Sequence, residues 1–286
     1  MISDRIRQHV DSLAPELSLA IEAAYRAGEI IRAGYGKLAK IDQKDLGDLV
    51  SEVDIEADEV ITSYLQSKSD LPILSEELNQ DTGPDGELWI VDPLDASSAY
   101  LMQAGVDYPS VLIAHWAGGL AQHAVGYFPL TQQWYYAQRG RGAWVDGRRL
   151  ICPPHVALSE VWVEMNAYGN ARWESEFFGD LRTRLRSQDG ARLVTSSVPN
   201  AGVAMRIARG DSGLAVAIHD NDPRSVKQGP WDIAAPQLIL EEAGGVFSNA
   251  DGEQVNAFRA EPFIVARSQG LADEVLELLA REPADR

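Results

Sequence analysis

The chain has 286 residues, of which 45% are hydrophobic and 24% are charged, as in folded globular proteins. Its 25 Lys and Arg residues are outnumbered by 43 Asp and Glu residues, so the formal net charge is −18. So acidic a surface repels nucleic-acid backbones and anionic lipid headgroups, which argues against a nucleic-acid polymer or a membrane as partner.

Two helices and two short strands are expected in the first third of the chain. Apolar residues recur at helical intervals over 17–31, and a second helix is expected to start after Asp54, a residue type that favours the N-cap position. Apolar runs follow at 72–74 and 88–91, and each ends in acidic residues. This pattern is typical of buried strands that deliver side chains to a site at their carboxyl ends.

The middle of the chain predicts an antiparallel meander, with strands expected at 111–116, 121–128, 134–137 and 143–145. Beyond it, strands and helices alternate: a strand near Val161, a helix over 171–187, a strand near Leu193, a helix over 199–209, a strand over 213–218, a helix over 231–243, a strand over 263–266 and a helix over 271–281. A boundary near 155 would therefore divide an α+β half (1–155) from an α/β half (156–286).

Five carboxylates stand at the ends of predicted elements: Asp54, Glu76, Asp92, Asp95 and Asp232. Two carboxylates held 4 Å apart repel each other by roughly 4 kcal/mol at an effective dielectric constant near 20. A cluster of them therefore needs cations. Hard oxygen ligands select Mg²⁺ or a similar ion, and the chain has no Cys and His spacing that would bind zinc.

The segment Asp92-Pro93-Leu94-Asp95 is the most informative of these. Proline fixes φ and removes an amide hydrogen, so the chain turns directly after the strand and can direct both aspartates and the Leu94 carbonyl toward one point. Ala96-Ser97-Ser98 then predicts a helix start, whose free amides suit a phosphate oxygen. Spacing alone leaves two interpretations open: a metal-assisted phosphoryl-transfer site, or an aspartate-capped turn among surface charges.

The ordered set of Asp54, Glu76-Glu77, Asp92-Pro-Leu-Asp95-Ala-Ser-Ser98 and Trp231-Asp232, followed by Glu242-Ala-Gly-Gly245, resembles the inositol monophosphatase superfamily. The resemblance runs from about residue 17 to the end and includes the Gly-Arg-Gly-Ala-Trp turn at 140–144. It implies an αβαβα layered sandwich, an α/β (α+β) fold. It also implies a Mg²⁺-dependent, lithium-sensitive hydrolase of small phosphate monoesters.

Roles for individual residues also come from the resemblance. Glu76, Asp92, the Leu94 carbonyl, Asp95 and Asp232 would hold two to three Mg²⁺ ions. Asp54 and Ser97 would orient the attacking water, with Glu76 also counted as catalytic. The amides of Ala96 and Ser97 would bind the phosphate, with Ser98 beside them. His219 begins a segment, 219–229, where the family selects its alcohol, and it is a candidate substrate contact.

Departures from the family pattern leave alternatives open. Ala96-Ser97 stands where the family usually has Gly-Thr, and alanine is strained if the turn needs a positive φ. A catalytically silent member that only binds a phosphorylated ligand is therefore one alternative. Leu74-Ser-Glu-Glu77 is more like the 3′(2′),5′-bisphosphate nucleotidases, whereas Ser98-Ala-Tyr100 is unlike them.

The main expectation is a phosphatase acting on an inositol, polyol or sugar monophosphate. Adenosine 3′,5′-bisphosphate is the alternative substrate. The single cysteine, Cys152, cannot form an intrachain disulfide, and the N-terminus lacks the apolar run of a signal peptide, so a cytoplasmic location is predicted. Homodimers, frequent in the family, are compatible with the sequence.

Overall fold

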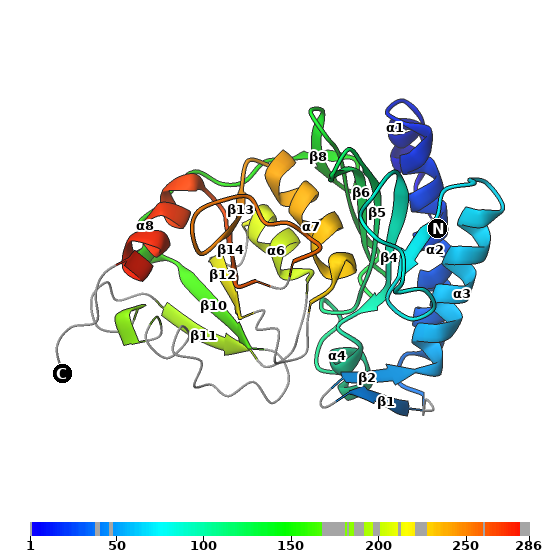
Figure 1. The fold of residues 1–286 in the computed structure, drawn as a ribbon, viewed down its shortest axis with the longest axis horizontal. Helices are drawn as coiled ribbons and strands as arrows, with labels where there is room; N and C mark the ends of the chain where they lie inside the picture. The colour runs from blue at the N-terminus through cyan, green and yellow to red at the C-terminus, as the bar shows by residue number, and fades with distance from the viewer. Residues whose placement is uncertain are drawn as a thin grey trace.

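Two large β-sheets form the centre of the fold, and helices lie outside and between them (Figure 1). The structure, a computed structural model, describes residues 2–37, 41–45, 48–167, 181, 183–185, 192–196, 201–210, 213–220, 228–259 and 261–280. The first sheet has seven strands in the order β3 (Ile73–Ser75), β4 (Leu88–Asp95), β5 (Ser110–Ala117), β6 (Leu120–Phe128), β7 (Gln133–Gln138), β8 (Gly142–Val145) and β9 (Arg148–Leu150). The second has five strands in the order β11 (Arg192–Ser196), β10 (Trp162–Ala167), β12 (Leu214–Asp220), β14 (Phe263–Ala266) and β13 (Val246–Asn249).

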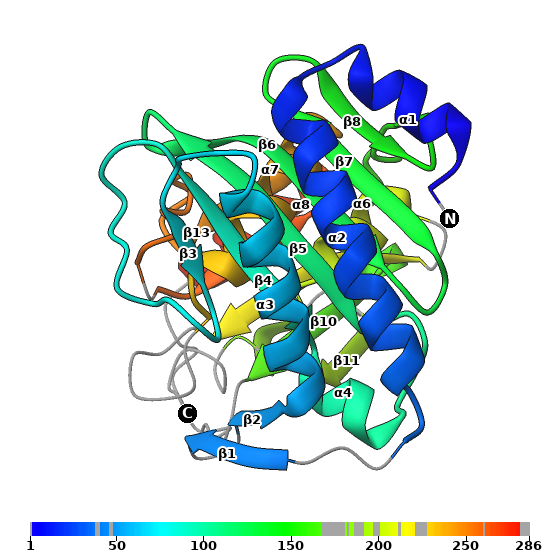
Figure 2. The ribbon, with the colours of Figure 1, turned by 90° about the vertical axis from the view of Figure 1, so that its right-hand side faces the viewer.

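The helices complete a layered arrangement that the two views show from perpendicular directions (Figures 1 and 2). The outer face of the first sheet carries α2 (Pro15–Gly34) and α3 (Glu52–Gln66), and α1 (Asp4–Asp11) packs against α2. The middle layer contains α6 (Val203–Arg209) and α7 (Pro230–Glu242), and α8 (Gln269–Ala280) covers the second sheet. The αβαβα fold implied by the resemblance is thereby confirmed.

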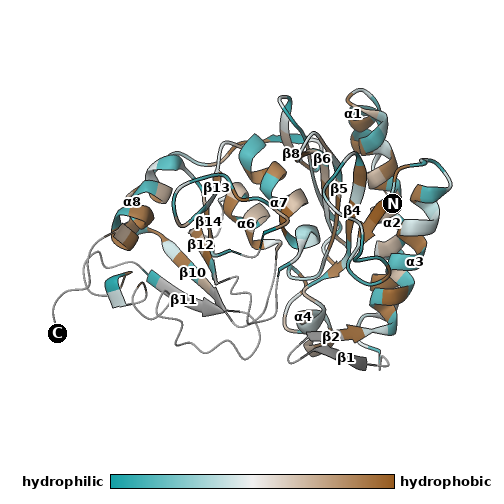
Figure 3. Cartoon of the chain, viewed as in Figure 1, coloured by the Kyte–Doolittle hydropathy of each residue, from teal (hydrophilic) through white to brown (hydrophobic). Residues whose placement is uncertain are grey.

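The first sheet is buried on both faces because its side chains alternate between two apolar clusters. Val111 and Ile113 of β5 pack with α2 and α3, whereas Leu112 and Ala114 of the same strand pack with α6 and α7. A Cβ atom on Gly28 of α2 would overlap the ring of Tyr127, so glycine at this position allows the helix to lie close to the sheet. In Figure 3, hydrophilic and hydrophobic residues alternate along the helices that cover the sheets, as expected for helices with one buried side.

Most of the predicted elements are present. The meander is β5 to β8, and the predicted helices over 17–31, 199–209, 231–243 and 271–281 correspond to α2, α6, α7 and α8. The predicted helix over 171–187 falls mostly outside the described residues. Sequence patterns missed α1, β9, β13 and the hairpin of β1 (Ile41–Asp45) and β2 (Asp48–Ser51), which are short or polar segments.

The predicted start of the second helix is wrong by one turn. Ser51, rather than Asp54, is the N-cap of α3, and its hydroxyl accepts a hydrogen bond from the amide of Val53. Asp54 is the third helical residue and accepts a hydrogen bond from the amide of Ser51 at 2.9 Å. This is a capping box, in which a carboxylate at the third position and the N-cap residue satisfy each other's free groups.

The predicted boundary near 155 follows β9, where the chain leaves the first sheet for the second. The packing does not break there, because one apolar cluster contains Leu88 and Leu112 from the first half together with Leu238 and Phe263 from the second. The division into two halves therefore stays a prediction about chain organisation. Among the described helices, none is both long and apolar enough to cross a bilayer.

Candidate active site

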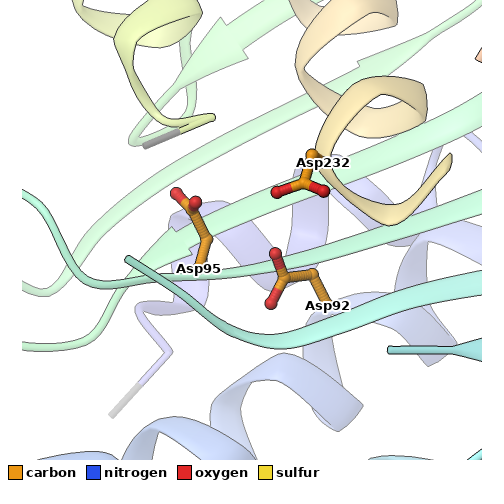
Figure 4. Close-up of side chains that lie close together, drawn as sticks. All are labelled: Asp92, Asp95 and Asp232. Carbon is orange, nitrogen blue, oxygen red and sulfur yellow. The ribbon is translucent and has the colours of Figure 1, made fainter. Parts of the chain in front are cut away.

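Strand β4 carries two of the predicted site carboxylates among its last four residues. All eight residues of β4 are buried, and the side chains of Asp92 and Asp95 are 1% and 4% exposed. The pairing of β4 with β5 shifts register between these two aspartates, where Pro93 interrupts the ladder. The irregularity turns both carboxylates to the same side (Figure 4).

Asp232 reaches the same point from the middle layer. It is the third residue of α7, after Pro230 at the first position, and it accepts a hydrogen bond from the Gly229 amide at 2.7 Å. Asp92, Asp95 and Asp232 each offer an oxygen atom, and the three atoms lie within 4.8 Å of one another (Figure 4). The structure therefore brings together three residues that are separated by up to 140 positions in the sequence.

The electrostatics of this trio call for a cation. Burial raises the pKa of Asp92 well above its usual value of 3.8, and the neighbouring carboxylates of Glu76, Asp95 and Asp232 raise it further. Asp92 Oδ1 accepts a hydrogen bond from the Leu94 amide at 3.0 Å. Its Oδ2 is buried and has no hydrogen-bond partner among the described residues, so it is an acceptor left open for a cation.

Asp95 connects the two halves of the chain. Its Oδ1 accepts a hydrogen bond from the Ala201 amide at 2.9 Å, and its Oδ2 accepts from the Gly202 amide at 3.1 Å and from the Ser110 hydroxyl at 2.9 Å. Burial raises the pKa of Asp95 to about 6, and these hydrogen bonds oppose the rise. The two amides were not predicted, because backbone groups leave no signal in residue type.

A second carboxylate and hydroxyl pair lies beside the trio. The hydroxyl of Ser97 lies 2.6 Å from Asp54 Oδ1 and 2.9 Å from the Leu94 carbonyl oxygen, and it can donate to one of them at a time. Asp54 Oδ2 accepts from the amide and the hydroxyl of Ser51, so the 1% exposed carboxylate has a fixed orientation. A hydrogen bond thus joins Asp54 and Ser97, the two residues predicted to orient the attacking water.

The turn between β4 and α4 (Ser97–Met102) takes a left-handed conformation. Ala96, the residue before the helix, has φ = 65° and ψ = 42°. The sequence left the sign of φ open here, and the structure has the strained one, which costs an alanine about 1–2 kcal/mol. Ser98, the next predicted contact, is the second residue of α4 and is half-buried.

Glu76 directly follows β3, the strand that pairs with β4. Its amide donates a hydrogen bond to the Val91 carbonyl at 3.1 Å, which places Glu76 next to Asp92. Glu76 is half-buried, and its charge is the largest of the carboxylate contributions to the raised pKa of Asp92. It lies beside the trio rather than within the 4.8 Å group formed by the described residues.

His219, a predicted substrate contact, lies in the core. Its side chain is on β12 with 1% exposure, and its ring stacks on Phe263 with centroids 4.4 Å apart and planes 11° apart. Burial lowers the pKa of His219 to about 3, so the ring is neutral. A packed, neutral ring does not offer the open surface that a substrate contact needs, and the substrate-binding role of His219 gains no support.

Comparison with known proteins identifies the family of the chain. Residues 12–283 match the model of the inositol monophosphatase family. The fructose-1,6-bisphosphatase/inositol-1-monophosphatase of Thermotoga maritima is 27% identical over 266 residues, which cover 92% of this chain and 95% of that protein. The Nus factor SuhB of Vibrio cholerae is 30% identical over 246 residues, covering 83% of this chain and 86% of that protein.

Solved structures share the fold. A staphylococcal inositol monophosphatase complexed with products superposes with a TM-score of 0.76 at 22% identity, covering 98% of this chain and 99% of that one. A dual-specific inositol monophosphatase and NADP phosphatase, bound with D-inositol-1-phosphate, superposes with a TM-score of 0.73 at 22% identity, with 96% of each chain covered. The chain belongs to the inositol monophosphatase family and is a metal-dependent phosphatase that hydrolyses phosphate monoesters.

Proposed function

We propose that this protein is a Mg²⁺-dependent phosphatase of an inositol monophosphate or a related polyol or sugar phosphate. The observation that carries the proposal is the convergence of Asp92, Asp95 and Asp232 beside the hydrogen-bonded pair of Asp54 and Ser97. The trio concentrates negative charge at one point of the fold. Divalent cations could bind to these carboxylates and in turn bind a phosphate ester.

The residues present fit Mg²⁺ because all the candidate ligand atoms are hard oxygens. Glu76, Asp92, the Leu94 carbonyl, Asp95 and Asp232 would hold two to three ions. Asp92 supplies an acceptor that no described residue hydrogen-bonds, and Asp95 accepts three hydrogen bonds where a carboxylate can accept about four. When bound, Mg²⁺ supplies charge stabilisation for the leaving oxygen and lowers the pKa of a coordinated water.

Asp54 and Ser97 have the geometry to handle the attacking water. The Ser97 hydroxyl donates to Asp54, so the lone pairs of its oxygen can accept a hydrogen from water and orient that water's oxygen toward phosphorus. Ser51 holds the far oxygen of Asp54, which keeps the pair aligned. Glu76, whose charge acts on Asp92, could accept a second hydrogen of the same water.

The phosphate group would lie over the turn that follows Asp95. The amides of Ala96, Ser97 and Ser98 precede or begin α4, and the first amides of a helix have no partner within it. These amides can therefore donate to phosphate oxygens that the carboxylates themselves would repel. We leave His219 out of this binding role because its ring is packed against Phe263.

Three features favour an active enzyme and a polyol substrate. First, the pair of Asp54 and Ser97 is formed at 2.6 Å although Ala96 is strained, which argues against a silent site. Second, a relative from Mesorhizobium japonicum, 29% identical over 246 residues, is an inositol-1-monophosphatase. Third, the Thermotoga relative also carries fructose-1,6-bisphosphatase in its name, so sugar phosphates belong in the same test. The bisphosphate nucleotidase alternative is supported only by the likeness of Leu74-Ser-Glu-Glu77, and the relatives named above favour the other substrates.

The family resemblance also underlies three further parts of the proposal. Lithium should inhibit the reaction, because Li⁺ would compete for a Mg²⁺ position among the carboxylates. A homodimer is proposed on the same basis, and a cytoplasmic location is proposed from the single cysteine and the lack of an apolar run near the N-terminus. Inhibition curves with LiCl, light scattering of the purified protein and fractionation of cells would test these three points separately.

Substitution of Asp92 by Asn tests the proposed reaction. The change removes one ligand charge from the trio, and we expect Mg²⁺-dependent phosphate release to fall by more than about 100-fold. Phosphate release is measured with inositol-1-phosphate, fructose-1,6-bisphosphate, NADP and adenosine 3′,5′-bisphosphate. The exposed Asp251, substituted in the same way, is the control and should retain full activity. Unchanged turnover in Asp92→Asn would overturn the proposal.

A further inference from the structure

Asp58 is a fully buried carboxylate that the proposed reaction does not use. It lies on α3, one helical turn after Asp54, and its side chain is 0% exposed. A buried carboxylate is costly unless it accepts hydrogen bonds. Asp58 Oδ2 accepts two of them, from the amides of Glu77 and Leu78, each at 3.2 Å. These amides belong to the loop that carries Glu76, so the buried side chain connects α3 to that loop.

The loop after β3 is held at several other points. The Ser75 hydroxyl accepts hydrogen bonds from the amides of Leu78 and Asn79, and the Glu76 amide donates to the Val91 carbonyl of β4. The Gln80 side chain donates to the Glu76 carbonyl. The backbone of Glu76 is therefore attached to β4 on one side and, through the next two amides, to Asp58 on the other.

The loop needs this attachment because Glu76 faces other carboxylates. Its charge is the largest of the carboxylate contributions that raise the pKa of Asp92, so the two side chains repel each other when no cation is bound. Repulsion favours any movement of the loop away from β4. The two hydrogen bonds from the amides of Glu77 and Leu78 to Asp58 oppose that movement, because moving the loop would leave a buried acceptor unsatisfied.

We propose that Asp58 is a positioning residue that sets Glu76 relative to Asp54 and thereby prepares the site for Mg²⁺. One turn of α3 carries both Asp54, which orients the water, and Asp58, which fixes the loop of Glu76. The spacing of the two functions is thus set by the helix rather than by the loop. This inference rests on the proposed function, because it treats Glu76 as a metal ligand.

The test measures Mg²⁺ binding without substrate, as the Mg²⁺ concentration that gives half of the maximal rise in melting temperature. Outer partners of metal ligands typically change affinity 10- to 100-fold, so Asp58→Ala should raise this concentration by about that factor. Asp58→Asn keeps an oxygen acceptor for the two amides and should recover at least half of the loss on a logarithmic scale. A value for Asp58→Ala within about twofold of the wild type would overturn the inference.

Two comparisons separate positioning from other effects. Asn249 is 7% exposed on the second sheet and accepts hydrogen bonds from the amides of Asp251 and Glu253, so Asn249→Ala removes a similar pair of bonds away from the trio. It should lower the melting temperature without changing the Mg²⁺ requirement. If Asp58→Asn is as impaired as Asp58→Ala, the charge alone matters and positioning is wrong. If Asp58→Ala does not fold, Asp58→Leu, which fills the buried space but accepts no hydrogen bond, carries the test, and normal Mg²⁺ binding in it would overturn the inference.

The proposed function can fail independently. Wild-type protein that gains melting temperature with Mg²⁺ but releases no phosphate would contradict the proposed reaction and leave the role of Asp58 in metal binding intact. If the wild-type protein releases phosphate and Asp58→Ala binds Mg²⁺ normally, the role of Asp58 would be overturned and the proposed reaction would remain.

Discussion

The two halves of the chain contribute to the site in different ways. The first half provides side chains at the ends of neighbouring elements, Asp92 and Asp95 on β4 and Asp54 on α3. Hydrogen bonds with Ser51 and Ser97 set the orientation of Asp54. The second half provides one carboxylate, at the start of α7, and two backbone amides that bind Asp95. The first half thus provides most of the proposed site side chains, whereas the second half adds the third carboxylate of the trio and the two amides that bind Asp95.

Because Asp232 lies on α7, the packing of the middle layer sets the position of one carboxylate of the trio. The buried residues of α7 include Ile233, Ala234, Leu238 and Leu240, and they form one cluster with residues of both sheets. A helix that is apolar around most of its circumference is held on several sides, which fixes the place of its first turn. The position of Asp232 relative to β4 therefore depends on the packing between the halves.

The largest expected effect comes from removing the second half's only carboxylate in the trio. Asp232→Asn keeps an oxygen acceptor for the Gly229 amide, so the start of α7 should remain folded. The ligand charge is lost, and Mg²⁺-dependent phosphate release should fall by more than about 100-fold. The melting temperature without Mg²⁺ should stay the same or rise, since repulsion on Asp92 is relieved.

A matched control lies at the other end of the same helix. Glu242 Oε1 accepts a hydrogen bond from the Gly140 amide of the first half at 2.7 Å, and Glu242→Gln keeps that acceptor. Activity in this variant should stay within about twofold of the wild type, because surface changes away from special features have small effects. Activity of Asp232→Asn above a tenth of the wild type would show that the first half suffices for the reaction.

The next effect is on stability without metal, where the first-half aspartates oppose folding at neutral pH. The pKa of Asp95 is raised from 3.8 to about 6 in the folded protein, and that of Asp92 is raised as well. A raised pKa means that the folded state keeps its proton longer than the unfolded state does. The resulting stability is fully present below pH 3.8 and is lost as the pH rises through 6.

Urea unfolding in EDTA at about pH 4.5 and pH 7 measures this effect. For Asp95 alone the free energy of unfolding should decrease on the order of 2–3 kcal/mol as the pH rises from below 3.8 to above 6. Mg²⁺ should restore the lost stability at pH 7. Asp95→Asn should show a smaller decrease because the titrating group is gone. Equal pH dependence in the variant and the wild type would mean that Asp95 does not titrate in this interval.

The smallest effect concerns the strained turn of the first half. Ala96→Gly relieves the positive φ, while glycine adds entropy to the unfolded chain, so a net gain of about 0.5–1 kcal/mol in the free energy of unfolding is expected. Gln103, at the other end of α4, has φ = 53°, and Gln103→Gly is the control for strain away from the phosphate position. Thermal unfolding checks both. A loss of stability in Ala96→Gly would show that the alanine methyl group contributes packing that outweighs its strain.

The second-half contributions were the harder ones to predict. Asp232 was found because its residue type and its neighbour Trp231 match a family pattern, but the amides of Ala201 and Gly202 have no residue type to recognise. His219 was selected for its position in the chain, and the structure buries it against Phe263. Position along the chain says little about the direction of a side chain when the strand has two buried faces.

The sequence by itself determined the strands of the meander and the alternation of strands and helices that follows it, whereas the layered fold and the proposed metal ligands came with the family resemblance. Apolar periodicity and turn residues act over short distances, and they are visible in a single chain. Only the tertiary structure decided which oxygen atoms meet, that Ala96 takes a left-handed conformation, and that Asp58 holds the loop of Glu76. These outcomes depend on contacts between segments far apart in sequence, where packing and backbone hydrogen bonds set the geometry.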